Sequence, residues 1–143
     1  MRTSYDKAFE IVVGLEGHIS NDPRDPGGFT VYGLSSRYNI GITKDLTLDD
    51  AKAIYLNNYW LPAGCDTAPF PWDIVLFDSA VNPQSGGNAE LLNQKPENWQ
   101  DFLILRMCRY MRKSKDIYVK GHLFRVLNLY QRIREISLAS EPT

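Results

Sequence analysis

The sequence predicts a mainly α domain of five to six helices with one small β ribbon. A chain of 143 residues is long enough for one hydrophobic core and short for two ordinary domains. Apolar residues recur at helical spacing through most of the chain, and only residues 29–34 combine several β-forming side chains in a short run. We therefore expect residues 1–143 to form a single domain.

The first predicted helix leads into an acidic residue. Its apolar stripe has the spacing i, i+3, i+4, i+7 and i+8 and consists of Tyr5, Ala8, Phe9, Val12 and Val13. The next position of this stripe is Glu16, and Gly14 and Gly17 flank the helix end. Because burying an unpaired carboxylate is costly, we expect Glu16 to line a pocket, the alternative being a frayed, solvated helix end.

A rigid loop and a ribbon follow this helix. The stretch NDPRDPGG at residues 21–28 is dense in turn formers and excludes a helix. The ribbon has apolar residues at Phe29, Val31, Tyr32 and Leu34.

Start and stop signals delimit the later helices. Thr47 with Asp50 three residues later predicts a capping box, and Trp60 and Pro62 end that helix. A core helix is predicted over WDIVLFDSAVN, residues 72–82, followed by a turn at QSGGN, a short helix through residues 91–92 and a long helix from Pro96. The last helix is predicted from about 121 to 137, with an inward face at Leu123, Val126, Leu127, Tyr130 and Ile133.

The net charge of −1 conceals an asymmetry. Residues 1–100 hold seven basic and thirteen acidic side chains, whereas residues 101–143 hold nine basic and four acidic ones. A basic C-terminal region suits nucleic acid, an anionic lipid surface or an anionic cell-wall polymer, and it equally suits the solvated faces of two helices. The candidates for a nucleic-acid contact are Arg106, Arg109, Arg112 and Lys113.

Several classes of protein are disfavoured by the sequence. No apolar run approaches the roughly 20 residues that cross a bilayer, and the charges at Asp6, Lys7 and Glu10 do not fit a signal peptide. We therefore expect a soluble protein made in the cytoplasm. Cys65 and Cys108 show no metal-binding spacing, and both are interpreted as ordinary buried thiols.

The segment from Glu16 to Thr30 has the residue types of a glycosidase site. Glu16 extends an apolar stripe, and desolvation there would raise its pKa and keep it protonated, while Asp25 among polar loop residues would stay ionised. A protonated and an ionised carboxyl group are what glycosidic bond cleavage requires, and the Thr30 hydroxyl is suited to hold the hydrolytic water. Loop acids beside proline and glycine also serve turns, which is the alternative role of Asp25. Tyr32 beside Gly33 has two possible roles, stacking on a sugar ring or packing as a buried aromatic.

The string LEGHISNDPRDPGGFTVYGLS resembles the opening motif of glycoside hydrolase family 108, N-acetylmuramidases found largely as phage endolysins. Later segments of the family are similar to three further stretches of this chain, IYLNNYW, LFDSAVN and the C-terminal YVKGHLFRVLNL. The resemblance implies a lysozyme-like fold, with residues 97–143 similar to the family's C-terminal peptidoglycan-binding helical region. It also implies that Glu16 is the catalytic glutamate, with Asp25 and Thr30 as its catalytic partners.

Further candidate substrate-binding residues come from the spacing of polar side chains and from the same resemblance. Asp78 and Asn82 are four residues apart on the core helix, and they either line the saccharide cleft or cap the helix end and its turn. Arg125 matches the family's terminal arginine and either pairs with a core carboxylate or contacts the acids of the wall peptides. His18 and Ile19 replace the usual glycine and aromatic after the glutamate, so the local turn departs from the family pattern.

The resemblance implies hydrolysis of the β-1,4 bond between N-acetylmuramic acid and N-acetylglucosamine, without a metal or cofactor. Peptidoglycan is the expected partner, with an anionic outer-membrane surface as a further one, no nucleic acid, and a monomeric state. A phage enzyme of this kind waits in the host cytoplasm until a separate pore releases it to the periplasm; a bacterial effector exported without a signal sequence is the alternative setting. The alternative functions are a non-catalytic peptidoglycan-binding or autolysis-regulating protein and a nucleic-acid binder.

Overall fold

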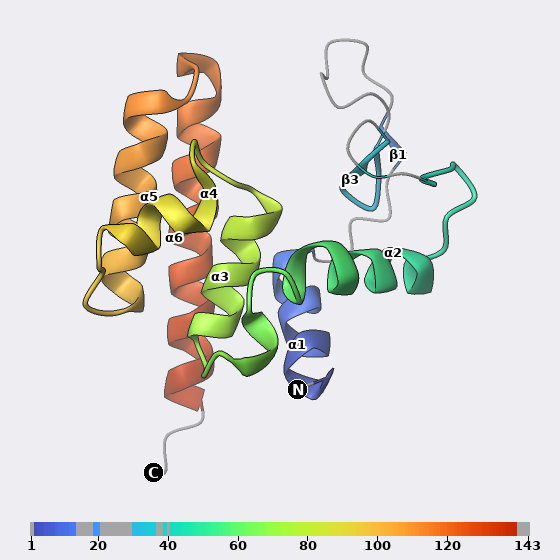
Figure 1. Cartoon of the computed structure of the whole chain (residues 1–143), viewed down its shortest axis with the longest axis horizontal. Coiled ribbons are helices and arrows are strands. Elements are labelled where there is room, and N and C mark those ends of the chain that lie inside the picture. Colours follow the sequence, from blue (N-terminus) through green and yellow to red (C-terminus); the bar gives the residue numbers. More distant parts are fainter. Residues whose placement is uncertain (1, 14–18, 21–29, 37–38, 40, 140–143) are drawn as a thin grey trace.

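The computed structural model describes residues 2–13, 19–20, 30–36, 39 and 41–139. Helices dominate these residues, which confirms the predicted mainly α class (Figure 1). The α-helices are α1 (Arg2–Val12), α2 (Leu48–Tyr55), α3 (Trp72–Val81), α4 (Gly87–Asn93), α5 (Trp99–Lys113) and α6 (Asp116–Ala139). A π-helical turn, η1 (Leu56–Trp60), extends α2, and a 3₁₀ turn, η2 (Cys65–Thr67), precedes α3. Among the described residues, none of the helices has the length and apolar character needed to span a bilayer.

The predicted ribbon is a three-stranded antiparallel sheet. Its strands are β1 (Ile19–Ser20), β2 (Thr30–Val31) and β3 (Leu34–Ser35). Within the predicted range 29–34, Tyr32 and Gly33 form a two-residue turn that joins β2 to β3, with φ angles of 51° and 79°. Two positive φ angles match the turn that suits the twist of a hairpin. The Tyr55 hydroxyl donates to the Tyr32 carbonyl at 2.9 Å, and a Cβ on Gly33 would lie 2.8 Å from the Tyr55 hydroxyl oxygen.

The predicted capping box of α2 is confirmed. The Asp50 backbone N–H donates to the Thr47 hydroxyl at 3.1 Å, and the Thr47 N–H donates to the Asp50 carboxylate at 3.2 Å. The helix then carries its aromatic residues into the core, where Tyr55 and Trp60 make edge-on contacts with Phe77 of α3. This cluster joins α1, α2 and α3, and the whole predicted stripe of α1 from Tyr5 to Val13 is buried.

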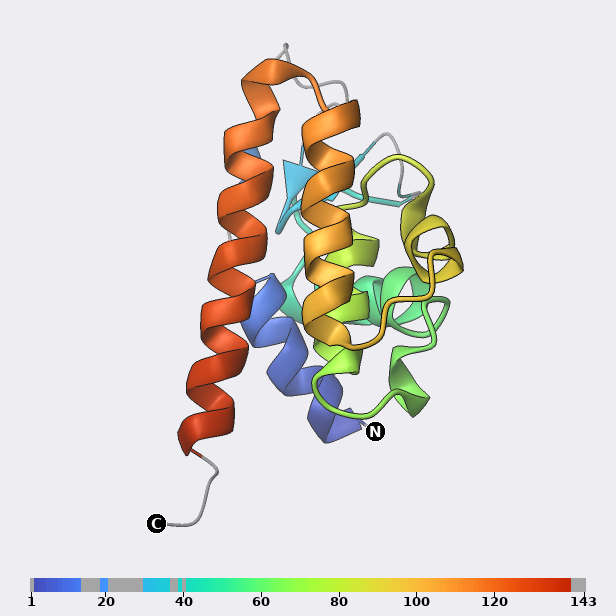
Figure 2. The ribbon, with the colours of Figure 1, turned by 90° about the vertical axis from the view of Figure 1, so that its left-hand side faces the viewer.

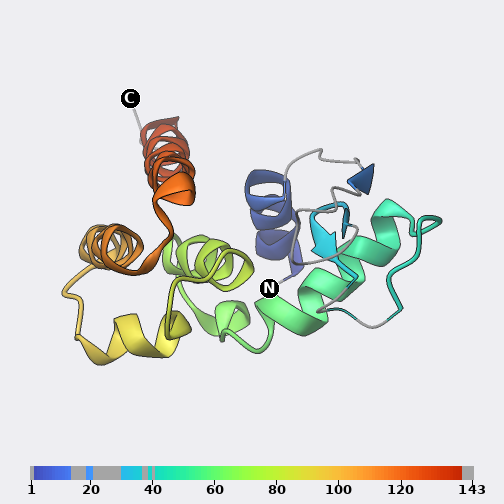
Figure 3. The ribbon, with the colours of Figure 1, turned by 90° about the horizontal axis from the view of Figure 1, so that it is seen from above.

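Helix α3 lies at the centre of the molecule. It contacts α1, α4 and α5, and every residue from Asp73 to Ser79 is buried. Figure 3 shows α1 between two groups of elements, with the sheet and α2 on one side and α3 to α6 on the other. A helix that is buried all round explains why the sequence of α3 is apolar nearly throughout.

The last two helices differ from the prediction at their starts and in one face. Helix α5 begins at Trp99 because the Asn98 side chain caps it, accepting from the Asp101 N–H at 2.7 Å. Helix α6 begins at Asp116 and packs along α5 (Figure 2). The predicted inward position Leu127 is wrong, since this side chain is exposed and Leu129 is buried in its place.

The two cysteines are free thiols. Cys65 is buried, as predicted, and burial together with the charges of Asp73 and Asp66 raises the pKa of its thiol to about 12. Cys108 is only half-buried. Neither residue forms a disulfide in this structure.

Candidate functional site

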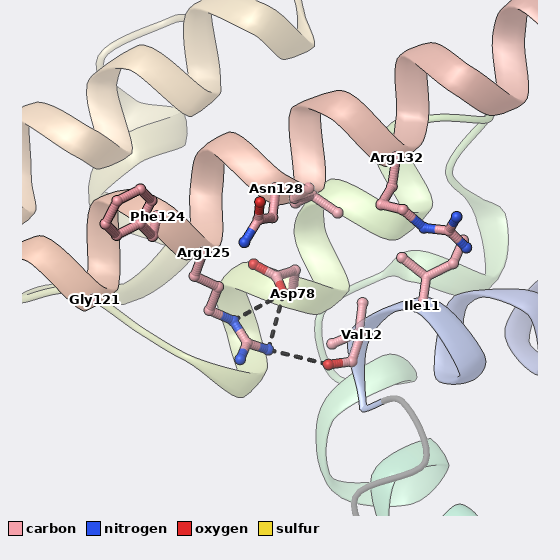
Figure 4. A pocket seen from close by; sticks show the side chains of 9 residues that line it. Ile11, Val12, Asp78, Gly121, Phe124, Arg125, Asn128 and Arg132 are labelled. Atoms are coloured by element: carbon pink, nitrogen blue, oxygen red, sulfur yellow. Dashed lines mark hydrogen bonds and ion pairs between the residues drawn. The ribbon is translucent and has the colours of Figure 1, made fainter.

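A groove of about 330 Å³ lies between α1 and α6, with α3 as its floor. Helix α1 contributes Ile11 and Val12, and α3 contributes Asp78 (Figure 4). The wall from α6 consists of Gly121, Phe124, Arg125, Asn128, Leu129 and Arg132. The groove therefore combines an apolar edge on α1 with a polar, cationic wall on α6.

The floor of this groove is a buried carboxylate held by two guanidinium groups. Asp78 is only 2% exposed. Arg106 donates to its Oδ2 from Nη1 at 2.6 Å, and Arg125 donates to its Oδ1 from Nε at 3.1 Å and approaches it through Nη2 at 3.0 Å. A buried ion is tolerated when it is paired and hydrogen-bonded in this way. One negative and two positive side chains leave this group with an excess positive charge.

Arg106 lies on the core side of Asp78. It is 0% exposed and donates to the Tyr110 hydroxyl from Nε at 3.2 Å and to the Asn82 carbonyl from Nη2 at 3.2 Å. The Tyr110 hydroxyl in turn donates to the same carbonyl, and burial raises its pKa. The guanidinium thus has protein partners for all three of its nitrogens.

The interpretation of Arg106 as one of a row of basic surface residues was wrong. Phe102, Arg106 and Tyr110 are spaced four residues apart and share the buried face of α5, a signal that the sequence did contain. Arg109 of the same row pairs with Glu90. Arg112 and Lys113 are the two of the four candidate residues whose side chains are exposed.

Arg125 lies on the groove side of Asp78. Its side chain is 35% exposed, and Nη2 also donates to the backbone carbonyl of Val12 at 3.3 Å. This one side chain therefore joins α6, α3 and the end of α1 (Figure 4). Of the two roles considered for Arg125, pairing with a core carboxylate is present in the structure; contact with wall peptides stays a prediction.

The comparisons with known proteins give the family. The family model described as Glycosyl hydrolase 108 matches residues 9–83. The chain belongs to this family. The match covers Glu16, Asp25 and Thr30 and extends through α3. Glycosyl hydrolase 108 is a family of glycoside hydrolases, which confirms the class indicated by the opening motif.

A solved structure shares the fold of this glycosyl hydrolase 108 chain. The structure of Brucella abortus SagA superposes with a TM-score of 0.69 at 23% identity, covering 97% of this chain and 96% of the SagA chain. None of the curated proteins matches the chain. The similarity to SagA supports the lysozyme-like fold over the whole chain.

The predicted catalytic residues of this glycosyl hydrolase 108 chain lie mostly outside the described residues. Glu16 and Asp25 fall there, as does His18 beside them in the sequence. Thr30 is described through its backbone only, pairing with Ser20 and Ser35 in the sheet. In the sequence, Glu16 follows Val12 by four residues, and the Val12 carbonyl is the group that Arg125 binds. The catalytic assignment stays a prediction.

The predicted binding residues of the chain occupy three different places. Asp78 lines the groove, although its carboxylate is engaged by the two arginines. Asn82 ends α3 as its C-cap, and its N–H donates to the Asp78 carbonyl at 3.0 Å. Tyr32 is half-buried in the turn of the sheet, with its carbonyl bound by Tyr55. Neither Asn82 nor Tyr32 lines this groove.

The sequence reasoning missed three groove residues of α6. Phe124, Asn128 and Arg132 recur every four residues and form one stripe of the groove wall. They lie on a helix face that the sequence analysis allowed to be solvated. An aromatic residue at an otherwise polar position of that face was the signal that could have identified them. In the described residues, no cluster of three or more His, Cys, Asp or Glu side chains is placed to hold a metal ion.

Proposed function

We propose that this chain is an N-acetylmuramidase that hydrolyses the β-1,4 bond between N-acetylmuramic acid and N-acetylglucosamine in peptidoglycan. The observation that carries the proposal is the family match over residues 9–83, because this range includes the full acidic motif from Glu16 to Thr30. The residue types of the motif suit glycosidic cleavage, which needs one protonated and one ionised carboxyl group.

The proposed mechanism assigns a role to each residue of the motif. Glu16 donates its proton to the glycosidic oxygen as the bond from that oxygen to the anomeric carbon breaks. A water molecule held by Asp25 and Thr30 attacks the anomeric carbon from the opposite face, and Asp25 accepts the proton that this water loses. The proposed outcome is inversion, which requires room for the water between the two carboxyl groups, about 6.5–9.5 Å in inverting enzymes.

Turbidity clearing by matched variants tests this proposal. Outer-membrane-permeabilised cells are treated with the wild type, with Glu16→Gln and with Glu10→Gln, which removes an exposed acid of α1 as the control. Loss of a general acid should slow clearing on the order of a hundredfold or more, while the control should clear like the wild type. Equal clearing by folded Glu16→Gln would remove this residue from the mechanism. The anomeric configuration of the released muropeptides tests inversion.

A non-catalytic peptidoglycan-binding or autolysis-regulating protein is the second candidate. It is favoured by one observation, the replacement of the glycine and aromatic that usually follow the catalytic glutamate by His18 and Ile19. This candidate requires that the wild type bind insoluble peptidoglycan without releasing reducing ends. Release of reducing ends by the wild type excludes it.

The proposed cellular setting is that of a phage endolysin. In this setting the enzyme accumulates in the host cytoplasm and reaches the wall only when a separate pore opens the inner membrane. Expression in a bacterial host should then cause lysis when a pore-forming protein is induced and little lysis without it. Lysis at the same rate without the pore would favour export by another route.

We also propose that the turn between α5 and α6 contacts an anionic membrane surface. Exposed apolar side chains at this turn are Met111, Ile117 and Tyr118, and exposed basic ones are Arg112, Lys113, Lys115 and Lys120. The turn lies at one end of the molecule (Figure 2). Basic residues beside apolar ones suit anionic lipid headgroups. Sedimentation with anionic but not zwitterionic vesicles is expected, and equal sedimentation with both would contradict the proposal.

A further inference from the structure

We propose that the stripe Phe124, Asn128 and Arg132 on α6 is a binding site for the acidic peptide substituents of the glycan strand. The inference rests on the proposed function, since it takes the substrate to be peptidoglycan. It adds a site outside the acidic motif, on a helix beyond the matched residues 9–83. The ligand chemistry it assigns is a peptide carboxylate beside a pyranose ring.

The shape of the α6 wall is suited to a ligand. Phe124 is 54% exposed, and Asn128 and Arg132 are exposed as well. Figure 4 shows Arg125 and Arg132 extending from α6 towards α1 across the groove. Gly121 continues the same stripe, and a Cβ added there would meet nothing within 4 Å, so no packing contact within the described residues requires a glycine at this position.

The charge of the groove selects an anion. The charged residues that line it are Asp78, Arg125 and Arg132. The buried Arg106 already neutralises Asp78, so the cations of Arg125 and Arg132 are in excess on the groove side. Arg132 has Glu135 as an ion partner at 3.5 Å, but both side chains are more than half exposed and such pairs are weak. A ligand carboxylate can therefore replace Glu135 at little cost.

One edge of the groove is also close in sequence to the proposed catalytic acid. In peptidoglycan the peptide is attached to the lactyl group of N-acetylmuramic acid, the sugar whose glycosidic bond the proposed reaction breaks. The α1 edge of the groove ends at Val12, four residues before the proposed acid Glu16. Phe124 offers an apolar surface for a sugar ring, Asn128 an amide for hydrogen bonds, and Arg132 a planar cation for the carboxylate.

Binding measurements without turnover test this inference. The background is Glu16→Gln, and the two probes are a muropeptide tetrasaccharide with its peptides and chitotetraose, which has neither lactyl groups nor peptides. Arg132→Gln should weaken affinity for the muropeptide by up to about fivefold and leave chitotetraose unchanged, because an exposed ion pair contributes about 1 kcal/mol or less. Phe124→Ala should weaken binding of both probes. Arg134→Gln, an exposed arginine of α6 outside this groove, is the matched control and should change neither affinity.

The outcomes separate the site from the reaction. Equal muropeptide affinity of the Arg132→Gln and Arg134→Gln proteins would overturn the inference, as would an equal loss for both probes or an absence of binding by either probe. Amide chemical shifts of α6 on titration with muropeptide should change around residues 124–132, and changes confined to other elements would contradict the site. If the wild type released no reducing ends while Glu16→Gln bound the two probes as expected, the proposed mechanism would fail and the α6 site would stand.

Discussion

Asp78 separates two regions of the molecule, the polar cluster buried between α3 and α5 and the open groove between α1 and α6. Both regions supply one arginine to the same carboxylate. Arg106 is fully buried with every nitrogen engaged, whereas Arg125 is about one-third exposed and binds the end of α1. The difference indicates two tasks for one ion group. The buried Arg106 neutralises Asp78 and so stabilises the fold. The partly exposed Arg125 places a positive charge beside Asp78 in the groove.

The largest expected effect on stability comes from replacing the buried Arg106. Arg106→Leu should lower the free energy of unfolding by about 3 kcal/mol, because removing one partner of a buried pair leaves the other poorly compensated. Urea unfolding followed by circular dichroism measures this change. Arg112→Leu, an exposed arginine of the same helix, is the control and should change stability by less than about 0.5 kcal/mol.

The partly exposed Arg125 should contribute less to stability than Arg106 and should act mainly by positioning the end of α1. Arg125→Gln is expected to cost about 1 kcal/mol, since Asp78 keeps Arg106 and water can reach the vacated position. The same change should lower kcat in muropeptide hydrolysis, because the Val12 carbonyl at the end of α1 loses its hydrogen bond from Arg125. Arg125→Lys should restore stability better than kcat, since a lysine cannot bind Asp78 and Val12 with the same planar fork. Equal destabilisation by the Arg106 and Arg125 changes would abolish the contrast between the two regions.

The smallest expected effect is a pH dependence at the edge of the buried cluster. The His122 ring stacks on Tyr110 at 4.4 Å, and Ser114 contacts its Nδ1 at 3.0 Å. Burial, with Arg106 and Arg125 nearby, lowers the pKa of His122 below its ordinary 6.5. Just below pH 6.5 the unfolded chain then binds more protons than the folded one, so stability falls as the pH falls through this window.

Unfolding measured between pH 7.5 and pH 5 checks this effect. The wild type should lose stability more steeply over that range than the His122→Gln protein. Identical slopes for the two proteins would show that folding does not lower the pKa of His122. A steeper loss of stability in the His122→Gln protein than in the wild type would contradict the expected direction of the pKa shift.

Local signals in the sequence were sufficient for much of the fold. The stripe of α1, the Thr47 capping box and the apolar run of α3 each depend on residues close together in the chain, and each is confirmed. Contacts with distant parts of the chain decide the details that local spacing leaves open. The turn at Tyr32 and Gly33 is fixed by Tyr55, more than twenty residues later. The inward position of Arg106 is decided by Asp78 on another helix.

Residue type and spacing are enough to specify the mainly α class, the order of the helices and the acidic motif that marks a glycosyl hydrolase 108 chain. The packing of the helices is needed to show which arginines share Asp78, and that Phe124, Asn128 and Arg132 face a groove. A helical period gives the angle between side chains on one helix. It does not give the neighbour that each face meets, since that depends on how α1, α3 and α6 pack together.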